Sequence, residues 1–283
     1  WSTARPSSTA GRRDPERHAF ARTAATWPMS GLQILLTNDD GIRATGFRAL
    51  YDALSEIADV TAVAPAVDQS AVGRQLSPSV SVSEHELGFE VDGTPADCVI
   101  AGLEVLLPGT DLVVAGCNDG ANLGAYVLGR SGTVSAAVES AFFDVPAMAV
   151  SLYVPVPADT TYDEVAVDYD SYAEATRAAR HLAEHAVGAG VFEQADYLNV
   201  NAPPAEWGPA PMEITEPSTV YRMRATHEGE QIELSDEIWA LMAEGEIPDA
   251  EGTDRRAVVD GKVSVSPLTA PHSTEHHDGL DAL

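Results

Sequence analysis

The chain has 283 residues, and 45% of them are hydrophobic, which is enough to fill the core of one large domain or two small ones. Its 44 acidic and 16 basic residues give a formal net charge of −28, and Lys262 is the single lysine. Such a surface repels nucleic acid backbones and anionic membranes, so neither is expected as a partner. The chain also contains no apolar run of the roughly 18 residues that a membrane-spanning helix needs.

The acidic residues are spread along the whole chain instead of gathering in a tail. This pattern favours adaptation to a high-salt cytoplasm, where screening removes the repulsion between like charges. A merely acidic protein is the alternative. Cys98 and Cys117 belong to no paired metal or redox spacing, so a reduced, cytoplasmic protein is expected.

Residues 1–28 differ from the rest because they are rich in Ser, Thr, Ala and Arg and lack a periodic apolar pattern. The composition is similar to that of a transit peptide. Met29 directly precedes the first strand and would make a natural start, so we predict a disordered leader and leave open whether it belongs to the native product. Residues 271–283 are predicted to form a flexible acidic tail, in which His276 and His277 are not expected to bind metal.

A short apolar run, residues 34–36, is predicted to form a strand that is buried on both faces of a parallel sheet. Asn38, Asp39, Asp40 and Gly41 follow it, at the strand end where open α/β sheets bind their ligands. Two adjacent carboxylates repel each other unless a cation neutralises them. Oxygen ligands suit Mg²⁺, Mn²⁺ or Ca²⁺ better than zinc, while a solvated turn is the alternative.

Apolar residues at helical spacing after Thr45 and an apolar run at 59–64 complete a strand–helix–strand unit. The polar loop 65–79 then leaves the same edge of the sheet as Asp39. Ser70 in this loop could reach a metal or a phosphate, or it could simply face water. Residues 80–83 and 89–91 are expected to pair as a hairpin. Thr94, Pro95 and Asp97 have the order of a helix N-terminus with a capping box.

A third buried strand is predicted at 111–115, and a loop dense in glycine follows it at 116–124. Such a loop lets the backbone approach a ligand closely, and Asn118 within it could offer an oxygen to a hard cation. Ser131 then begins a helix, whose free N–H groups could bind an anion, although a plain serine cap is equally well supported. Later elements are expected as strands at 146–152, 197–201 and 262–267, helices at 169–187 and 235–242, and hairpins within 211–234.

Taken together, these segments resemble the SurE family of metal-dependent 5′-nucleotidases over about residues 33–268. The matching motifs are Asn38-Asp39-Asp40-Gly41, the Ser70 loop, Gly93-Thr94-Pro95-Ala96-Asp97, Asn118 with Gly120, Asn122 and Gly124, Ser131-Gly132-Thr133, and the later segments 198–203 and 263–268. The resemblance implies a three-layer αβα fold with a Rossmann-like, mostly parallel sheet over residues 29–270. It also implies a C-terminal hairpin or extension, within 155–250, that joins subunits into a homodimer or homotetramer.

The resemblance further implies one divalent cation per subunit, Mg²⁺, Mn²⁺ or similar, held by Asp39, Asp40, Ser70 and Asn118. The two aspartates would be the catalytic residues. The substrate and its phosphate would contact Asn38, Gly41, Asn118, Asn122, Ser131, Gly132 and Thr133.

The implied reaction is removal of phosphate from nucleoside 5′-monophosphates, and 3′-monophosphates remain open. A nucleotide-binding sensor without turnover is the alternative. Phosphatases that form an aspartyl-phosphate fit poorly, because their aspartates stand one residue apart and Asp39 and Asp40 are adjacent. The chain departs from the family pattern in two places: residues 115–118 read Ala-Gly-Cys-Asn where Ser-Gly-Ile/Val-Asn is common, and Arg130 stands where Tyr or His is common.

Overall fold

A computed structural model describes residues 31–156, 160, 164–165 and 167–270. The leader expected at 1–28 and the tail expected at 271–283 lie outside the described residues. Within these ranges, none of the helices is both long enough and apolar enough to cross a membrane.

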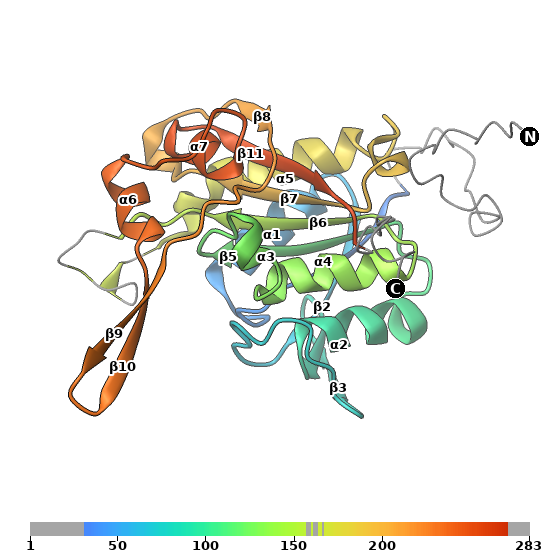
Figure 1. The fold of residues 1–283 in the computed structure, drawn as a ribbon. Helices are drawn as coiled ribbons and strands as arrows, with labels where there is room; N and C mark the ends of the chain where they lie inside the picture. The colour runs from blue at the N-terminus through green and yellow to red at the C-terminus, as the bar shows by residue number, and fades with distance from the viewer. Residues whose placement is uncertain (1–30, 157–159, 161–163, 166, 271–283) are drawn as a thin grey trace, which may run out of the picture.

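Nine strands form the central sheet (Figure 1). They are β1 (Gln33–Thr37), β2 (Asp59–Pro65), β3 (Ser81–His85), β4 (Gly88–Asp92), β5 (Leu112–Asp119), β6 (Ala147–Leu152), β7 (Tyr197–Ala202), β8 (Met212–Ile214) and β11 (Val263–Leu268). Their order is β3-β4-β2-β1-β5-β6-β7-β11-β8, and all pairs from β4 to β7 are parallel. The pairs β3–β4 and β7–β11 are antiparallel. The predicted mostly parallel α/β sheet and the predicted hairpin at its edge are confirmed.

Helices cover both faces of this sheet. On one face, α1 (Thr45–Ser55) and α5 (Ala173–His185) pack over a core that includes Ile34 and Leu36. On the other, α2 (Pro95–Ala101) and α4 (Gly132–Phe142) pack over a core that includes Leu35. Successive residues of β1 therefore point to opposite cores, as expected for a strand buried on both sides. The three-layer arrangement is confirmed.

The remaining elements are short. They are the π turn η1 (Gly102–Leu106), the 3₁₀ turns η3 (Tyr169–Tyr172), η4 (Val191–Glu193) and η5 (Ala205–Trp207), and the helices α3 (Ala125–Leu128), α6 (Ile238–Glu244) and α7 (Asp254–Val259). The capping box predicted before α2 is present: the Thr94 hydroxyl accepts from the Asp97 N–H, and the Asp97 carboxylate accepts from the Thr94 N–H.

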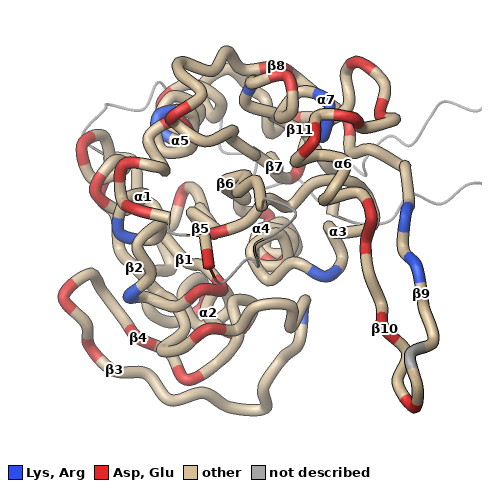
Figure 2. The backbone as a smooth tube through the Cα atoms, turned by 90° about the vertical axis from the view of Figure 1, so that its left-hand side faces the viewer, with Lys and Arg blue, Asp and Glu red and all other residues tan. Residues whose placement is uncertain are grey.

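A separate hairpin of β9 (Met223–Glu228) and β10 (Gln231–Asp236) extends away from the body of the protein in Figures 1 and 2. Hairpins were predicted in this part of the chain, and this one is confirmed. The start of the helix predicted at 235–242 was wrong, because residues 235 and 236 pair within β10 and the helix begins at Ile238.

The boundary predicted between the third strand and the glycine-rich loop was also wrong. β5 continues through Asp119, because after an irregularity it pairs again with β6, Asn118 opposite Ser151 and Asp119 opposite Leu152. Asn118 is thus held by the sheet itself. The long helix predicted at 169–187 is shorter, since a 3₁₀ turn occupies its first residues and α5 ends at His185.

Candidate active site

Asn38, Asp39 and Asp40 leave the carboxyl end of β1 at the middle of the sheet. Asn38 is fully buried, and its side-chain amide donates to the Gly41 carbonyl at 2.9 Å, which closes the turn. The other side-chain atom, Asn38 Oδ1, is buried and has no hydrogen-bond partner among the described residues. The turn is therefore fixed from inside and presents the two aspartates side by side.

Asp39 is directed at the start of α4. The Thr133 hydroxyl donates to Asp39 Oδ1, and the residue Asp39 is 4% exposed. A Cβ placed on Gly132 would lie 2.7 Å from Asp39 Oδ2, so only a glycine allows the helix to come this close. Ser131 caps the helix, because its hydroxyl accepts from the Val134 N–H at 3.1 Å.

Asp40 is directed instead at the end of β5, where the Asp119 N–H donates to Asp40 Oδ2 at 3.2 Å. Burial raises the pKa of Asp40 to about 7, and the neighbouring Asp39 charge adds to the rise. Burial also raises the pKa of Asp39, although the hydrogen bond from Thr133 partly opposes it. The ion pairs within the described ranges include neither aspartate, so no protein cation balances their charge there.

The loop after β2 reaches the same edge, as predicted. The Gln69 N–H donates to the Asp39 carbonyl at 2.7 Å and fixes the loop beside the aspartates. Ser70 itself is exposed, and both its N–H and its hydroxyl bond to Asp68 Oδ1, at 2.7 and 2.6 Å. The structure thus brings the Ser70 loop to the site but turns the Ser70 hydroxyl toward Asp68.

Asn118 and Asn122 have different surroundings. The Asn118 side-chain amide donates to the Gly120 carbonyl, which leaves its oxygen as the atom that a cation would use. Asn122 is buried, with its N–H donating to Asn201 Oδ1 at 2.7 Å and its side-chain amide donating to the Ser151 hydroxyl at 2.9 Å. Asn122 therefore ties the glycine-rich loop to β6 and β7, a structural role that its predicted contact with substrate did not anticipate.

The donors at this edge fit a hard divalent cation. Asp39 is buried and the adjacent Asp40 is partly buried, both have raised pKa values, and neither has a counter-charge among the described residues. The neutral oxygens of Ser70 and Asn118 come from the flanking segments. Among the described residues, no three His, Cys, Asp or Glu side chains cluster as a metal site. A cation here would depend on two carboxylates completed by neutral oxygens, the donor set that Mg²⁺ and Mn²⁺ accept.

Two further carboxylates act on this site, and sequence reasoning missed both. The charges of Asp68 and Asp119 each contribute to the raised pKa of Asp40, and Asp68 acts on Asp39 as well. Asp119 directly follows Asn118, and Asp68 stands two residues before Ser70. Both acids lie within segments that the sequence had already indicated, the Ser70 loop and the segment that contains Asn118. Considering every carboxylate in these segments would have found them.

Known proteins are similar to this chain over most of its length. The family model described as "Survival protein SurE" matches residues 34–230. The chain belongs to the SurE family. A protein named 5′-nucleotidase SurE from Haloarcula marismortui is 68% identical over 250 residues, which cover 88% of this chain and 93% of that protein. One of the same name from Natronomonas pharaonis is 66% identical, over 89% of this chain and 98% of the relative.

The fold is also similar to that of a solved structure from the same family. The crystal structure of the SurE protein from Aquifex aeolicus superposes with a TM-score of 0.70 at 30% sequence identity, covering 86% of this chain and 95% of that one. The resemblance drawn from the sequence motifs is thereby confirmed, and so is membership of a family whose named relatives are nucleotidases.

Proposed function

We propose that this protein is a divalent-metal-dependent phosphohydrolase that removes phosphate from nucleoside 5′-monophosphates. The observation that carries the proposal is the adjacent pair of Asp39, which is buried, and Asp40, which is partly buried, at a strand end where no described cation of the protein balances their charge. The names of relatives up to 68% identical support the same activity. A sensor that binds nucleotide without turnover is not favoured, because those relatives are named as enzymes.

One divalent cation per subunit, Mg²⁺, Mn²⁺ or similar, would be held by Asp39, Asp40, Ser70 and Asn118. The chemistry that a bound cation supplies is neutralisation of phosphate charge and activation of water. The Ser70 hydroxyl donates its hydrogen to Asp68, so the lone pairs of its oxygen stay available to such a cation.

The other roles in the proposed reaction fall to residues of the chain. Asp39 and Asp40 are the catalytic pair: they hold the charge of the site and orient the attacking water, while Thr133 keeps Asp39 in place. The first turn of α4, Ser131 to Thr133, presents N–H donors beside Asp39, where they would bind phosphate oxygens and stabilise the transition state. Asn38 and Gly41 form the turn that would lie beneath the phosphate, and Asn122 ties the glycine-rich loop to β7.

We further propose that subunits associate through the part of the chain after residue 155, in a homodimer or homotetramer. The β9–β10 hairpin supports this, because it leaves the body and carries exposed apolar side chains at Ile232 and Leu234. A cytoplasmic location is supported by Cys98 and Cys117, which are buried and not bonded to each other.

Release of inorganic phosphate from AMP tests the proposed activity. With Mn²⁺ we expect turnover, EDTA should abolish it, and Mg²⁺, Mn²⁺ or Co²⁺ should restore it to different degrees. Full activity in a metal-free preparation would contradict the metal site, and AMP binding without phosphate release would instead support a sensor. A panel of 5′- and 3′-monophosphates then defines the preferred base and phosphate position.

A further inference from the structure

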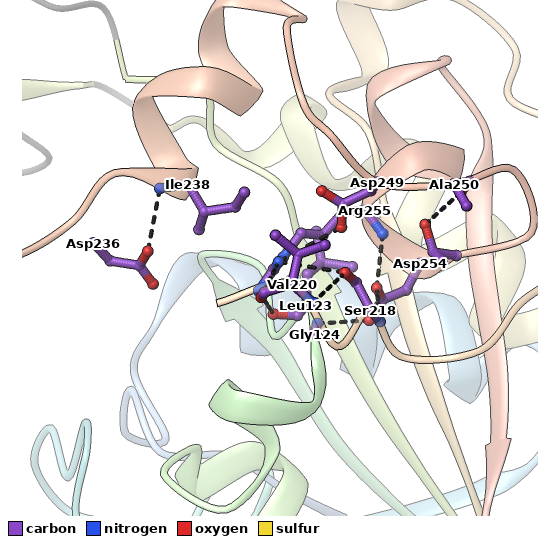
Figure 3. Close-up of polar contacts among 11 residues, drawn as sticks. Leu123, Gly124, Ser218, Val220, Asp236, Ile238, Asp249, Ala250, Asp254 and Arg255 are labelled. Atoms are coloured by element: carbon purple, nitrogen blue, oxygen red, sulfur yellow. Dashed lines mark hydrogen bonds and ion pairs between the residues drawn. The ribbon is translucent and has the colours of Figure 1, made fainter. Parts of the chain in front are cut away.

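A buried ion pair lies outside the catalytic pair, between α7 and the segment before it. Arg255 Nη1 is 3.5 Å from Asp249 Oδ1, and their side chains are 1% and 0% exposed (Figure 3). Both Asp249 oxygens and Arg255 Nε have no hydrogen-bond partner among the described residues. A buried pair with unmet hydrogen bonds contributes little net stability compared with apolar residues of the same size, so its presence calls for another role.

The other contacts of Arg255 indicate that role. Its Nη1 donates to the Val220 carbonyl at 2.9 Å and to the Ser218 hydroxyl at 3.5 Å, and its Nη2 donates to the Leu123 carbonyl at 3.5 Å. One guanidinium thus joins two segments that lie about a hundred residues apart in the sequence, the end of the glycine-rich loop and the segment that leads into β9. Asp249 balances the positive charge of the Arg255 guanidinium.

Asp254 joins the same two segments. Its carboxylate accepts from the Gly124 N–H at 2.6 Å and from the Ser218 N–H at 2.9 Å, and the Ala125 N–H donates to the Ser218 carbonyl at 2.8 Å. We refer to Asp249, Asp254 and Arg255 as the α7 clamp. Gly124 has φ +83°, and a Cβ there would lie 2.2 Å from Arg255 Nη2, so the loop is shaped to admit the guanidinium.

What the clamp fixes is α3, which begins at Ala125 and leads directly to the start of α4. Tyr126 on α3 meets Tyr221 edge to face at 4.6 Å, and the Arg130 guanidinium lies 3.7 Å from the centre of the Tyr126 ring. Arg130 also donates to the Tyr126 carbonyl at 3.0 Å and forms no ion pair with a carboxylate of the described residues. Arg130, the residue directly before Ser131, thus holds its charge against a pair of aromatic rings, beside the helix start that we propose binds phosphate.

The metal side of the site is held by different contacts. Asp39 is fixed by Thr133, Asp40 by Asp119, Ser70 by Asp68, and Asn118 by the Gly120 carbonyl. None of these contacts involves the α7 clamp. Loosening the clamp should consequently shift α3 and Tyr221 and leave the residues proposed to hold the cation where they are.

We propose that Arg255 is a positioning residue for substrate binding: through the α7 clamp it places Tyr126, Arg130 and Tyr221 beside the phosphate site. The proposal rests on the proposed nucleotidase function. It predicts a change in KM for the nucleotide with little change in kcat, whereas a purely structural role would lower the melting temperature or the active fraction and leave KM unchanged.

Two variants test the proposal with the full-length protein in high salt. Arg255→Lys keeps the charge opposite Asp249 but loses the fork that reaches Leu123, Ser218 and Val220 together. The double variant Asp249→Leu/Arg255→Met removes both buried charges at similar volume and so avoids leaving one charge unpaired. Arg256→Lys is the matched control, because the side chain of the neighbouring Arg256 pairs with Asp260 at 3.3 Å, and no hydrogen bond or ion pair of the described residues joins it to the loop.

KM and kcat for AMP with Mn²⁺, the dissociation constant of Mn²⁺ by calorimetry and the melting temperature are measured for each variant. We expect KM to rise about tenfold in both clamp variants, with kcat within about twofold and Mn²⁺ affinity and the control unchanged. An unchanged KM in a folded double variant, or a loss of Mn²⁺ affinity that parallels KM, overturns the proposal. Absence of turnover in the wild-type protein would instead refute the nucleotidase function.

Discussion

Asp39 and Asp40 are adjacent in sequence but are held by opposite sides of the site. The Thr133 hydroxyl holds Asp39 at α4, and the Asp119 N–H holds Asp40 at β5. Each carboxylate is thus oriented before any ligand arrives, which reduces the entropy that a cation or substrate must remove on binding. The cost of this arrangement is electrostatic, since burial raises the pKa of both groups and the charge of Asp39 raises the pKa of Asp40 further.

Asp40→Asn should lower the turnover of AMP at least about 100-fold, which corresponds to roughly 3 kcal/mol of transition-state stabilisation at about 1.4 kcal/mol per tenfold. The substitution removes charge next to the proposed cation without changing the shape of the side chain. Phosphate release and melting temperature are measured on the same variant, with Asp92→Asn, an exposed aspartate at the end of β4, as the control. Near-normal turnover would leave the proposed metal site without support.

The raised pKa of Asp40, about 7, also predicts how the stability of the metal-free protein depends on pH. Between its ordinary value of 3.8 and about 7, the folded protein binds a proton that the unfolded chain has released. The free energy of unfolding therefore falls as pH rises through this window. In EDTA, the melting temperature should be higher at pH 5 than at pH 8, and Asp40→Asn should flatten the slope. An equal slope in the variant would show that other groups cause it.

At the level of single residues, the sequence located the aspartates because a buried strand followed by an acidic turn determines where both lie. It did not determine the direction of the Ser70 hydroxyl, because that direction is set by a hydrogen bond to Asp68, two residues away. The contact between Arg255 and Leu123 could not be predicted from the sequence, because the two residues are 132 positions apart and no spacing rule connects them.

Among the elements, the buried parallel strands were the most predictable, because an apolar run between turn residues has few other solutions. The end of β5 could not be predicted, because glycine and asparagine are typical of loops. Only the pairing with β6 keeps residues 116–119 in the strand. α3 and α7 were missed because they are four and six residues long and show no apolar period. Short helices of this kind depend on tertiary contacts such as the α7 clamp.

The β9–β10 hairpin stands apart from the central sheet, and an isolated two-stranded hairpin is marginally stable in water. Ile232 and Leu234 lie on one face of β10 and are 65% and 70% exposed. Contact with another subunit would bury this face and stabilise the hairpin.

Ile232→Ser/Leu234→Ser should therefore reduce the mass measured by light scattering in high salt, with the wild-type protein at least a dimer. The two serines keep the pairing of β9 and β10 but remove the apolar surface that a second subunit would cover. Val105→Ser, at a 73% exposed position in η1, is the matched control and should leave the mass unchanged. A single 29.8 kDa species for the wild-type protein would refute association through this part of the chain.

Over the whole molecule, acidic residues are distributed around the fold, while basic residues are few (Figure 2). Most of the described arginines are already paired with carboxylates, several of them on the surface, for example Arg48 with Asp52 and Arg180 with Glu56. These exposed pairs contribute little stability individually. The remaining negative charge opposes the compact state at low salt, and this repulsion is a property of the whole surface that no single residue carries.

The free energy of unfolding should accordingly increase with ionic strength well beyond the range in which most proteins respond. At about 0.1 M salt the Debye length is about 10 Å, long enough for neighbouring carboxylates to repel each other, and at about 1 M it falls to about 3 Å. We expect the melting temperature to rise steadily between these concentrations of KCl in EDTA-treated protein. Sucrose is the control, because it favours burial without screening charge and should not reproduce the full increase. Maximal stability below about 0.2 M KCl would contradict adaptation to high salt and support a merely acidic protein.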